Sequence, residues 1–341
     1  MLAVRACLQQ AIRQYFQQHG YLEVETPLLS QDIVVDAHLD PLTVNKQTET
    51  NTSDRTTEHR RLFLQTSPEA GMKRLLAAGS GSIFQICKSF RGGECGTRHN
   101  PEFTMVEWYG IGDSYEQQMQ MTEDLIRHAA DCLHQSGMNL QLTDQEVVAV
   151  ESSPLQSARY RRTTYQQAFT SALDLDPLKT SNGQLRQRCA SFGLISETTD
   201  VIARDDLLNL LLAAKVEPGL GQGTAEFIRD YPISQAALAE VNSNDPRTAC
   251  RFELYCNGIE LCNGYQELTD AVELQRRAAL ENDRRQDRCE VELPGARRLQ
   301  QAMQQGLPRC SGVALGFDRL VMCLLGKAEI SDVIPFPSDR A

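Results

Sequence analysis

Residues 252–268, FELYCNGIELCNGYQEL, constrain the fold of this chain more than any other stretch. Asn-Gly is the strongest two-residue signal for a β-hairpin, because both central residues of the favoured turn take positive φ. A turn at residues 257–258 places Tyr255 opposite Glu260. Side chains alternate between the two faces of a strand, so Glu253, Tyr255 and Glu260 share one face. The sequence therefore predicts an antiparallel hairpin that carries two carboxylates on the same face.

This register also places Cys262 opposite Glu253 and leaves Glu267 on the other face, unless a bulge or turn at Asn263-Gly264 returns it. The alternative is a surface hairpin with solvated glutamates. Four apolar residues occupy the same strands, namely Phe252, Leu254, Ile259 and Leu261. Because buried, unpaired carboxylates are costly, these neighbours favour a binding site. Mg²⁺ is commonly held by one or two carboxylates together with phosphate oxygens, so this face is a candidate magnesium site.

The rest of the chain mixes strand and helix patterns without regular alternation. A second pair of strands, at 82–90 and 102–110, flanks a polar, glycine-rich turn, and residues 3–19 have the period of an amphipathic helix. Further candidates are strands at 21–29, 62–67 and 311–317, and helices at 67–79, 115–135, 270–290 and 318–326. Because strands and helices do not alternate as in βαβ units, we expect an α+β fold with a mostly antiparallel sheet flanked by helices.

The segment 143–248 has a different character from its surroundings. It contains several helix patterns, of which DDLLNLLLAAKV is the clearest, and no obvious chemistry. We interpret it as a mainly helical insertion into a single domain that spans residues 1–341. Residues 45–60 are polar without any period and predict an exposed loop.

Composition excludes several classes of protein. A net charge of −11, with no long basic run, disfavours nucleic-acid binding. Eleven cysteines without a Cys-x-x-Cys pair indicate reduced thiols rather than disulfides or a zinc site. No apolar run has the length of a membrane span, and the first residues lack the apolar core of a signal peptide. We therefore expect a soluble, cytoplasmic protein without a membrane partner.

Three segments resemble the signature motifs of class II aminoacyl-tRNA synthetases. LEVETPLL at 22–29 resembles motif 1, the dimer-interface element, and thus implies a homodimer. SFRGGECGTRHNPEFTMVEWY at 89–109 resembles motif 2, and SGVALGFDRLVM at 311–322 resembles motif 3. The runs HNPEFTM-x-E and GIELCNGYQELTDA are similar to lysyl-tRNA synthetase in particular. The resemblance covers nearly the whole chain and implies the class II catalytic fold.

Within that class, the chain is most similar to the elongation factor P–lysine ligase family. The shared features are SPE at 67–69, GVALG at 312–316 and the terminal S-x-DRA. The motif 1 helix starts at the first residues, so we expect no N-terminal anticodon-binding OB domain. The resemblance implies that a lysine-type amino acid, in the family (R)-β-lysine, is activated by ATP as an adenylate and transferred to a lysine side chain of elongation factor P. Transfer RNA is not an expected partner.

The resemblance also implies an ATP site with Mg²⁺. Adenylation is in-line attack of a carboxylate on the α-phosphate, so catalysis depends mainly on positioning and charge neutralisation. As the catalytic residues, Arg91 would hold the α-phosphate and Arg319 the γ-phosphate. Adenine would stack on Phe103 with Arg319 on its other face, while Glu253 and Glu260 would hold Mg²⁺. The other positions implied at ATP are Gly92, Gly93, Asn100, Leu261 and Gly316.

For the amino acid, the resemblance implies a pocket of carboxylates. Glu69, Tyr109 and Glu267 match positions that bind the amino groups of lysine. Two carboxylates in a closed pocket suit a substrate with two ammonium groups. The remaining positions implied at the amino acid are Ser67, Pro68 and Ala314.

The chain departs from the class pattern at two positions. Motif 2 normally reads Arg-x-Glu, whereas here Gly93 stands in the place of the glutamate and Glu94 follows one position later. Glu94 substitutes if the glycines let the loop shift; otherwise we expect a weaker enzyme. Motif 3 usually has Gly where this chain has Ala314, an alanine that the ligase family shares.

Two other functions are compatible with the motifs. A truncated lysyl-tRNA synthetase would charge tRNA, but the missing OB domain, the acidic charge and Ala314 argue against it. A catalytically silent regulator would bind an amino acid or its adenylate. The Gly93 departure supports that reading, and the retained arginines and glutamates argue against it.

Overall fold

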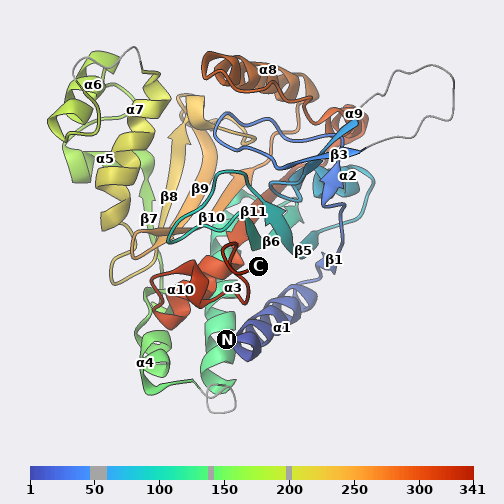
Figure 1. The fold of residues 1–341 in the computed structure, drawn as a ribbon, viewed down its shortest axis with the longest axis vertical. Helices are drawn as coiled ribbons and strands as arrows, with labels where there is room; N and C mark the ends of the chain where they lie inside the picture. Colours follow the sequence, from blue (N-terminus) through green and yellow to red (C-terminus); the bar gives the residue numbers. More distant parts are fainter. Residues whose placement is uncertain (47–59, 137–141, 197–201) are drawn as a thin grey trace, which may run out of the picture.

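The computed structural model describes residues 1–46, 60–136, 142–196 and 202–341. An eight-stranded sheet forms its centre (Figure 1). In chain order its strands are β1 (Leu22–Glu23), β5 (Ile83–Phe90), β6 (Glu102–Ile111), β7 (Arg161–Thr164), β8 (Glu226–Pro232), β9 (Thr248–Cys256), β10 (Ile259–Gln266) and β11 (Cys310–Gly316). Their spatial order is β1-β5-β6-β11-β10-β9-β8-β7, and the parallel pairs are β1 with β5 and β7 with β8. The predicted α+β fold with a mostly antiparallel sheet is confirmed.

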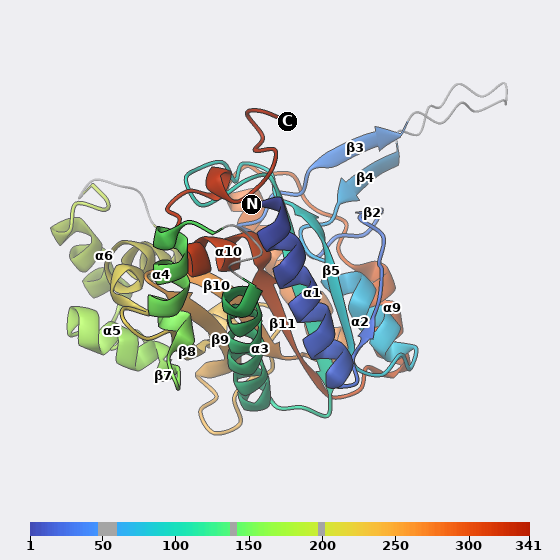
Figure 2. The same ribbon diagram turned by 90° about the horizontal axis from the view of Figure 1, so that it is seen from below.

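One face of the sheet is covered by three helices, α1 (Leu2–Gln18), α3 (Tyr115–Ser136) and α10 (Phe317–Leu325) (Figure 2). Together with the strands they form the largest apolar core. The predicted helix near the N-terminus buries every fourth residue, from Val4 and Leu8 to Phe16. The Phe16 ring stacks on Phe84 of β5 at 4.5 Å, which joins the helix to the sheet.

The opposite face carries α2 (Glu69–Ala77), α8 (Ala271–Asp287) and α9 (Arg297–Gly306), which share a second apolar cluster. Figure 1 shows α8 lying above the sheet. A three-stranded sheet in the order β2-β4-β3 lies beside α2, with bounds β2 (Leu29–Ser30), β3 (Thr43–Lys46) and β4 (Arg60–Leu64). Of the loop predicted at 45–60, residues 47–59 lie outside the described residues, and its ends belong to the paired strands β3 and β4.

The segment 143–248 is mainly helical where it is described. Its helices are α4 (Asp144–Ser152), α5 (Tyr165–Leu173), α6 (Asn182–Ser191) and α7 (Arg204–Leu211), followed by a π-helical turn, Leu212–Val216. Most of them surround an apolar cluster of their own, which continues into Tyr231 and Tyr255 of the sheet. Strands β7 and β8, which extend the large sheet at its edge, were not predicted from the sequence. The boundary of an insertion within one domain stays a prediction.

The strand predicted at 21–29 is mostly irregular. Leu22 and Glu23 pair with β5, Leu29 and Ser30 pair with β4, and the residues between them pass from one sheet to the other. Pro27 lies in this crossing; it has no N–H to donate to a ladder and restricts the residue before it. The alternating pattern at 21–29 therefore corresponds to two short strands in different sheets, and not to one continuous strand.

The hairpin of β9 and β10 has the predicted turn, with φ of 49° at Asn257 and 71° at Gly258. Its register beyond Glu260 differs from the prediction. Leu261 forms a β-bulge, so Asn263 rather than Cys262 lies opposite Glu253. The extra residue reverses the alternation and returns Glu267 to the face of Glu260. A bulge does restore Glu267, as the sequence suggested, but it lies at Leu261 and not at Asn263-Gly264.

Cys-Asn-Gly occurs twice in residues 252–268, and its second copy, at 262–264, is regular strand, so Gly264 serves packing rather than a turn. Gly264 pairs with Phe252 in β9, and a Cβ at this position would overlap the Phe252 ring. Phe252 is fully buried, so the ring has little room to move.

We expect Gly264→Ala to destabilise the protein by about 2 kcal/mol, because overpacking a tight core usually costs 1–3 kcal/mol. Gly183→Ala is the matched control, since a Cβ there meets no atom within 4 Å. Urea unfolding followed by circular dichroism measures both variants. Equal midpoints for Gly264→Ala and wild type would contradict the packing role.

Throughout the described ranges, every helix is too short or too polar to cross a membrane.

Candidate active site

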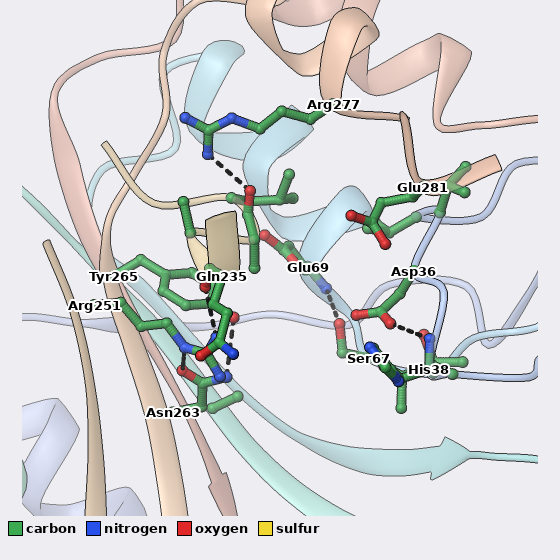
Figure 3. Close-up of a pocket in the computed structure, with 18 of the residues that line it drawn as sticks. Asp36, His38, Ser67, Glu69, Gln235, Arg251, Asn263, Tyr265, Arg277 and Glu281 are labelled. Carbon is green, nitrogen blue, oxygen red and sulfur yellow. Dashed lines mark hydrogen bonds between the residues drawn. The ribbon is translucent and has the colours of Figure 1, made fainter. Parts of the chain in front are cut away.

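A cavity of about 1170 Å³ opens on the face of the sheet that is turned away from α1 and α3. Its floor is formed by β6, β9, β10 and β11, and α8 with the chain around Asp36 and Gln235 forms its walls (Figure 3). The predicted residues that line it are Ser67, Glu69, Arg91, Asn100, Phe103, Tyr109, Glu253, Glu260, Leu261, Glu267, Ala314, Gly316 and Arg319. The structure thus brings most of the predicted site into one cleft, while Pro68, Gly92 and Gly93 lie beside it.

Arg91 leaves the end of β5 and lies over a predicted stacking ring. Its guanidinium carbon is 5.0 Å from the centroid of the Phe103 ring, so Arg91 contacts one face of this ring. Its Nη1 lies 3.5 Å from Glu94 Oε1, and its buried Nε has no partner within the described residues. An arginine with an unused donor in a cleft is suited to bind an anion.

Glycine is favoured at the two positions after Arg91 for different structural reasons. Gly92 N–H donates to the Asp40 carbonyl at 2.6 Å, and a Cβ at residue 92 would lie 3.1 Å from the same oxygen. Gly93 has a φ of 75°, which favours glycine. Gly93 takes the left-handed conformation, and the acidic residue follows one position later in the sequence, as Glu94. The Glu94 side chain then faces Arg91. Glu94 therefore lies beside Arg91, and its replacement of the usual motif 2 glutamate stays a prediction.

Arg319 lies in the first turn of α10 and is held from two sides. Its Nη1 donates to the Glu260 carbonyl at 3.0 Å, and the Glu260 carboxylate is 3.5 Å away. Its Nη2 lies 2.7 Å from His99 Nε2, so this imidazole nitrogen must accept. Burial and the charge of Arg319 lower the pKa of His99, which keeps the ring neutral at pH 7. The sequence left His99 unassigned, and the structure places it against Arg319.

Asn100 closes the motif 2 loop by contacts within the protein. Its Nδ2 donates to the Glu102 carbonyl at 2.6 Å, and its Oδ1 accepts from the Ser338 N–H at 2.9 Å. Asn100 therefore ties the loop to the C-terminal segment as well as lining the cleft.

Glu253 and Glu260 share one face of the hairpin, but their surroundings differ. The Glu253 carboxylate is buried and accepts from Tyr231 and Tyr255 hydroxyls at 2.5 and 2.6 Å and from Arg251 at 2.5 Å. Arg251 also donates to Asn263 and to the Gln235 carbonyl (Figure 3). The charge of Glu253 is thus compensated within the protein.

Glu260 is partly exposed and faces the cleft. Burial and the neighbouring Glu253 raise its pKa, against the opposing charges of Arg319 and Arg91. A carboxylate in that position gains from a cation. Within the ranges described, no group of three or more His, Cys, Asp or Glu residues could hold a metal ion alone. The residues fit a Mg²⁺ that takes few ligands from the protein and the rest from phosphate oxygens.

The segment 143–248, which showed no obvious chemistry in the sequence, contributes to this end of the cleft. Glu217 follows the π-helical turn, and its Oε1 lies 3.2 Å from the Tyr255 hydroxyl oxygen. Burial, Glu253 and Glu260 raise its pKa to about 7. Tyr231 of β8 also lines the cavity. Glu217 and Tyr231 were not predicted because they lie far in the sequence from the three motifs.

The other end of the cleft is a buried pocket of carboxylates around a lysine. Glu69 begins α2, its N–H is 3.3 Å from Ser67 Oγ, and Lys73 follows one turn later. The Lys73 Nζ lies 2.6 Å from Glu69 Oε1 and 2.5 Å from Glu267 Oε2. Burial and Glu69 raise the pKa of Glu267 to about 7, although Lys73 opposes this.

Glu107 of β6 completes the pocket. Its Oε1 accepts from the Tyr109 hydroxyl at 2.6 Å, and its buried Oε2 has no partner within the described residues. Burial and the charges of Glu69 and Glu267 raise its pKa to about 8. An unpaired buried carboxyl oxygen is costly unless a ligand binds it.

The floor of the pocket is shaped by small residues in β11. Ala314 pairs with Glu107 on one side and Asn263 on the other, and Gly312 pairs with Tyr109 and Tyr265. A Cβ at residue 312 would overlap the Tyr109 ring and the Glu267 carboxylate. The small side chains thus leave the space in which these polar groups converge.

Lys73, Glu107 and Gly312 were not predicted, although simple patterns point to them. Strand alternation from Phe103 places Glu107 and Tyr109 on the same face, and the helical period places Lys73 one turn from Glu69. Glu107 stands within the HNPEFTM-x-E run that had been recognised only as a signature.

Arginines at one end of an antiparallel sheet and buried carboxylates at the other agree with the class that the motifs resemble. The chain belongs to the tRNA synthetases class II (D, K and N), whose family model matches residues 1–340. Among its relatives is the elongation factor P--(R)-beta-lysine ligase of Salmonella gallinarum, 43% identical over 340 residues, which cover 100% of this chain and 95% of the relative. The enzymes of the same name from Yersinia enterocolitica and Salmonella paratyphi B are 43% and 42% identical over the same shares.

Proposed function

We propose that this chain activates a lysine-type amino acid with ATP and transfers it to a lysine side chain of elongation factor P. The preferred amino acid is (R)-β-lysine, after the name of the relatives. The observation that carries the proposal is the single cleft, in which an arginine-lined end meets a buried carboxylate pocket. The arginine-lined end is suited to bind a nucleoside triphosphate, and the carboxylate pocket is suited to bind ammonium groups.

In the first step, the carboxylate of the amino acid attacks the α-phosphorus of ATP, and pyrophosphate leaves. Arg91 neutralises charge on the α-phosphate, Arg319 binds the γ-phosphate, and adenine stacks on Phe103. Gly92, Gly93, Leu261 and Gly316 shape the backbone around the nucleotide. Magnesium, held by Glu260 with Glu253 beside it, would offset phosphate charge. Positioning and fixed charges are the main sources of catalysis in such a displacement.

The two ammonium groups of the amino acid bind in the carboxylate pocket. Glu69 and Glu267 each have one oxygen on Lys73, and one oxygen of Glu107 has no partner among the described residues. Ser67 and Pro68 fix the start of α2, and Ala314 limits the depth of the pocket. This arrangement orients the carboxylate of the amino acid towards Arg91 and the α-phosphate.

In the second step, the neutral Nζ of the acceptor lysine attacks the carbonyl carbon of the adenylate. The C–O bond to AMP breaks, an amide forms, and the attacking nitrogen loses a proton to solvent. We also propose that the enzyme works in the cytoplasm.

A homodimer is a further part of the proposal. The motif 1 region presents exposed apolar side chains, with 70% of Leu2, 57% of Leu22 and 40% of Leu29 accessible. Large apolar side chains left exposed on a helix and two strands can be covered by a second copy of the chain. Light scattering after gel filtration measures the mass, and a monomer at micromolar concentration would contradict this part.

The function is tested by incubating the purified protein with ATP, Mg²⁺ and labelled (R)-β-lysine, with elongation factor P and lysine tRNA offered together. We expect label on elongation factor P. Label on tRNA would identify a small synthetase instead. Absence of label from both acceptors, with no ATP–pyrophosphate exchange for either (R)-β-lysine or α-lysine, would identify a silent binding protein.

Amino-acid binding should strengthen as the pH rises from about 6 to 8.5. The raised pKa values of Glu267, about 7, and Glu107, about 8, leave these groups partly protonated at low pH. An ammonium prefers the ionised form, so each group adds up to about tenfold in affinity per pH unit below its pKa. Calorimetric titration of the amino acid across this range measures the slope, and pH-independent affinity would contradict the role of both carboxylates.

A further inference from the structure

Lys73 is a buried lysine for which the proposed chemistry has no direct use. Its side chain is 2% exposed, and its Nζ contacts Glu69 and Glu267 at 2.6 and 2.5 Å. It also lies 6.0 Å from the centroid of the Tyr109 ring. Lysine is rarely buried without a charged partner, and here both partners are residues of the proposed substrate pocket. The ammonium of Lys73 therefore lies where it can act on the substrate-binding carboxylates.

The ammonium is permanently charged. Burial lowers the pKa of Lys73, but Glu267 and Glu69 raise it further, so the net shift is upward. In return, Lys73 is the strongest group that favours the ionised form of Glu267. Two buried carboxylates that face each other without a cation would share a proton instead. Lys73 therefore controls how many negative charges the pocket contains.

The net charge of the pocket side chains matches a ligand with two positive charges. The pocket contains Glu69, Glu107 and Glu267 against the one ammonium of Lys73, which leaves two negative charges when all are ionised. An ion pair that served stability alone gains little over packed apolar residues, so stability is a weak reason for a charged group here. A ligand with two ammonium groups balances the remaining charge.

We propose that Lys73 is a positioning residue for the amino-acid substrate, which holds one oxygen each of Glu69 and Glu267, separates their carboxylates, and so adapts the pocket to amino acids with two ammonium groups. The inference rests on the proposed function, because it assigns the substrate to this pocket. Lys73 occupies the place between the two carboxylates, so a substrate ammonium must bind to their outer oxygens. This fixes its position relative to Arg91.

The test compares Lys73→Ala and Lys73→Gln with wild type by calorimetric titration of (R)-β-lysine and of ATP. We expect amino-acid affinity at pH 7 to fall about 100-fold, the size of loss found when one partner of a buried charge network is removed, with ATP affinity unchanged. Lys179→Ala is the matched control, because Lys179 is 70% exposed and pairs with Asp176 in the helical segment. Wild-type amino-acid affinity in both Lys73 variants would overturn the proposal.

The pH dependence separates positioning from simple packing. The titratable groups around Lys73 are Glu69 of α2, Glu107 and Tyr109 of β6, Tyr265 and Glu267 at the end of β10, and Cys310 of β11. Without Lys73, the pKa of Glu267 rises further, so more of this carboxyl is protonated at pH 7 than at pH 9. We therefore expect the penalty to shrink between pH 7 and pH 9. A penalty that is the same at both pH values indicates lost packing and would contradict the proposal.

Chemical rescue gives a second, independent measurement. n-Propylammonium replaces the atoms that Lys73→Ala removes, and n-propanol has nearly the same size without charge. We expect the ammonium to restore at least tenfold in amino-acid affinity and the alcohol to restore none. Equal rescue by both compounds would mean that volume, not charge, is missing.

The outcomes are distinguishable from failure of the proposed function. A wild-type protein that binds neither (R)-β-lysine nor α-lysine would refute the function itself. Wild-type binding with unaffected Lys73→Gln would refute only the role of Lys73. Thermal melts show whether each variant folds, and unfolding of both variants would make Lys73 a folding residue and overturn the proposal.

Discussion

Replacing Arg319 with alanine should slow adenylate formation by about 10³-fold or more, the range in which arginines that stabilise a phosphoryl-transfer transition state contribute. Arg319 stands at the start of α10 and reaches over the cleft to Glu260 and His99. Its guanidinium is permanently charged and its fork can bind two phosphate oxygens at once. An alanine leaves the charge of the leaving pyrophosphate without this partner.

The same variant should leave the amino-acid end intact, because Arg319 does not contact Glu69, Glu107 or Glu267. ATP–pyrophosphate exchange measures the rate without any acceptor, and calorimetry measures amino-acid affinity. Arg319→Lys keeps the charge but loses the fork, so we expect an intermediate rate. Arg247→Ala is the control, since Arg247 is 51% exposed and pairs with Asp245 only two residues away.

Two results would count against this role. An exchange rate of Arg319→Ala within about tenfold of wild type would show that Arg319 does not bind the transition state. An equal loss of amino-acid affinity and of exchange would show that the side chain supports the whole cleft through Glu260 and His99 instead.

Local patterns in the sequence were enough for the central hairpin turn and for the N-terminal helix. Asn257-Gly258 determined a turn because its positive φ values are a property of two adjacent residues. The helical spacing from Val4 to Phe16 determined the buried face of α1 for the same reason. In both, the information lies within one turn or one helix.

Features that depend on tertiary contacts were not predictable in this way. The bulge at Leu261 is defined by the pairing of β10 with β9, and sequence alternation alone placed the irregularity at Asn263-Gly264. Gly264 has the appearance of a turn residue, yet it is required by the Phe252 ring on the next strand. Gly in a strand often marks a close approach, which only the paired strand identifies.

The charge balance of the pocket was also hidden from the sequence. Glu69 and Glu267 were assigned from motifs, but the cation between them and the third carboxylate come from α2 and β6. Glu217 comes from the segment that had seemed without chemistry. Motifs identify side chains that act on the substrate directly, whereas the groups that set their charge lie wherever the fold brings them.

Replacing Glu267 with glutamine should weaken amino-acid use by about 10²- to 10³-fold at pH 8 while ATP affinity stays nearly constant, as expected when one carboxylate of a buried charge network is neutralised. Glu267 is 1% exposed, and its Oε2 contacts Lys73 at 2.5 Å. The glutamine leaves Lys73 with Glu69 alone, so one negative charge is missing when the substrate ammonium arrives. KM for the amino acid and KM for ATP in the exchange reaction measure the two effects separately.

The penalty should depend on pH in a definite direction. The pKa of Glu267 is raised to about 7, so below pH 7 the wild-type carboxyl is largely protonated and glutamine imitates it well. Above pH 7 the wild-type group is ionised and the difference between the two proteins grows. Glu151→Gln is the control, since this side chain is 55% exposed and distant from the cleft. A penalty that is larger at pH 6 than at pH 8, or equal losses for the amino acid and ATP, would mean that Glu267 acts by supporting the fold and not by its charge.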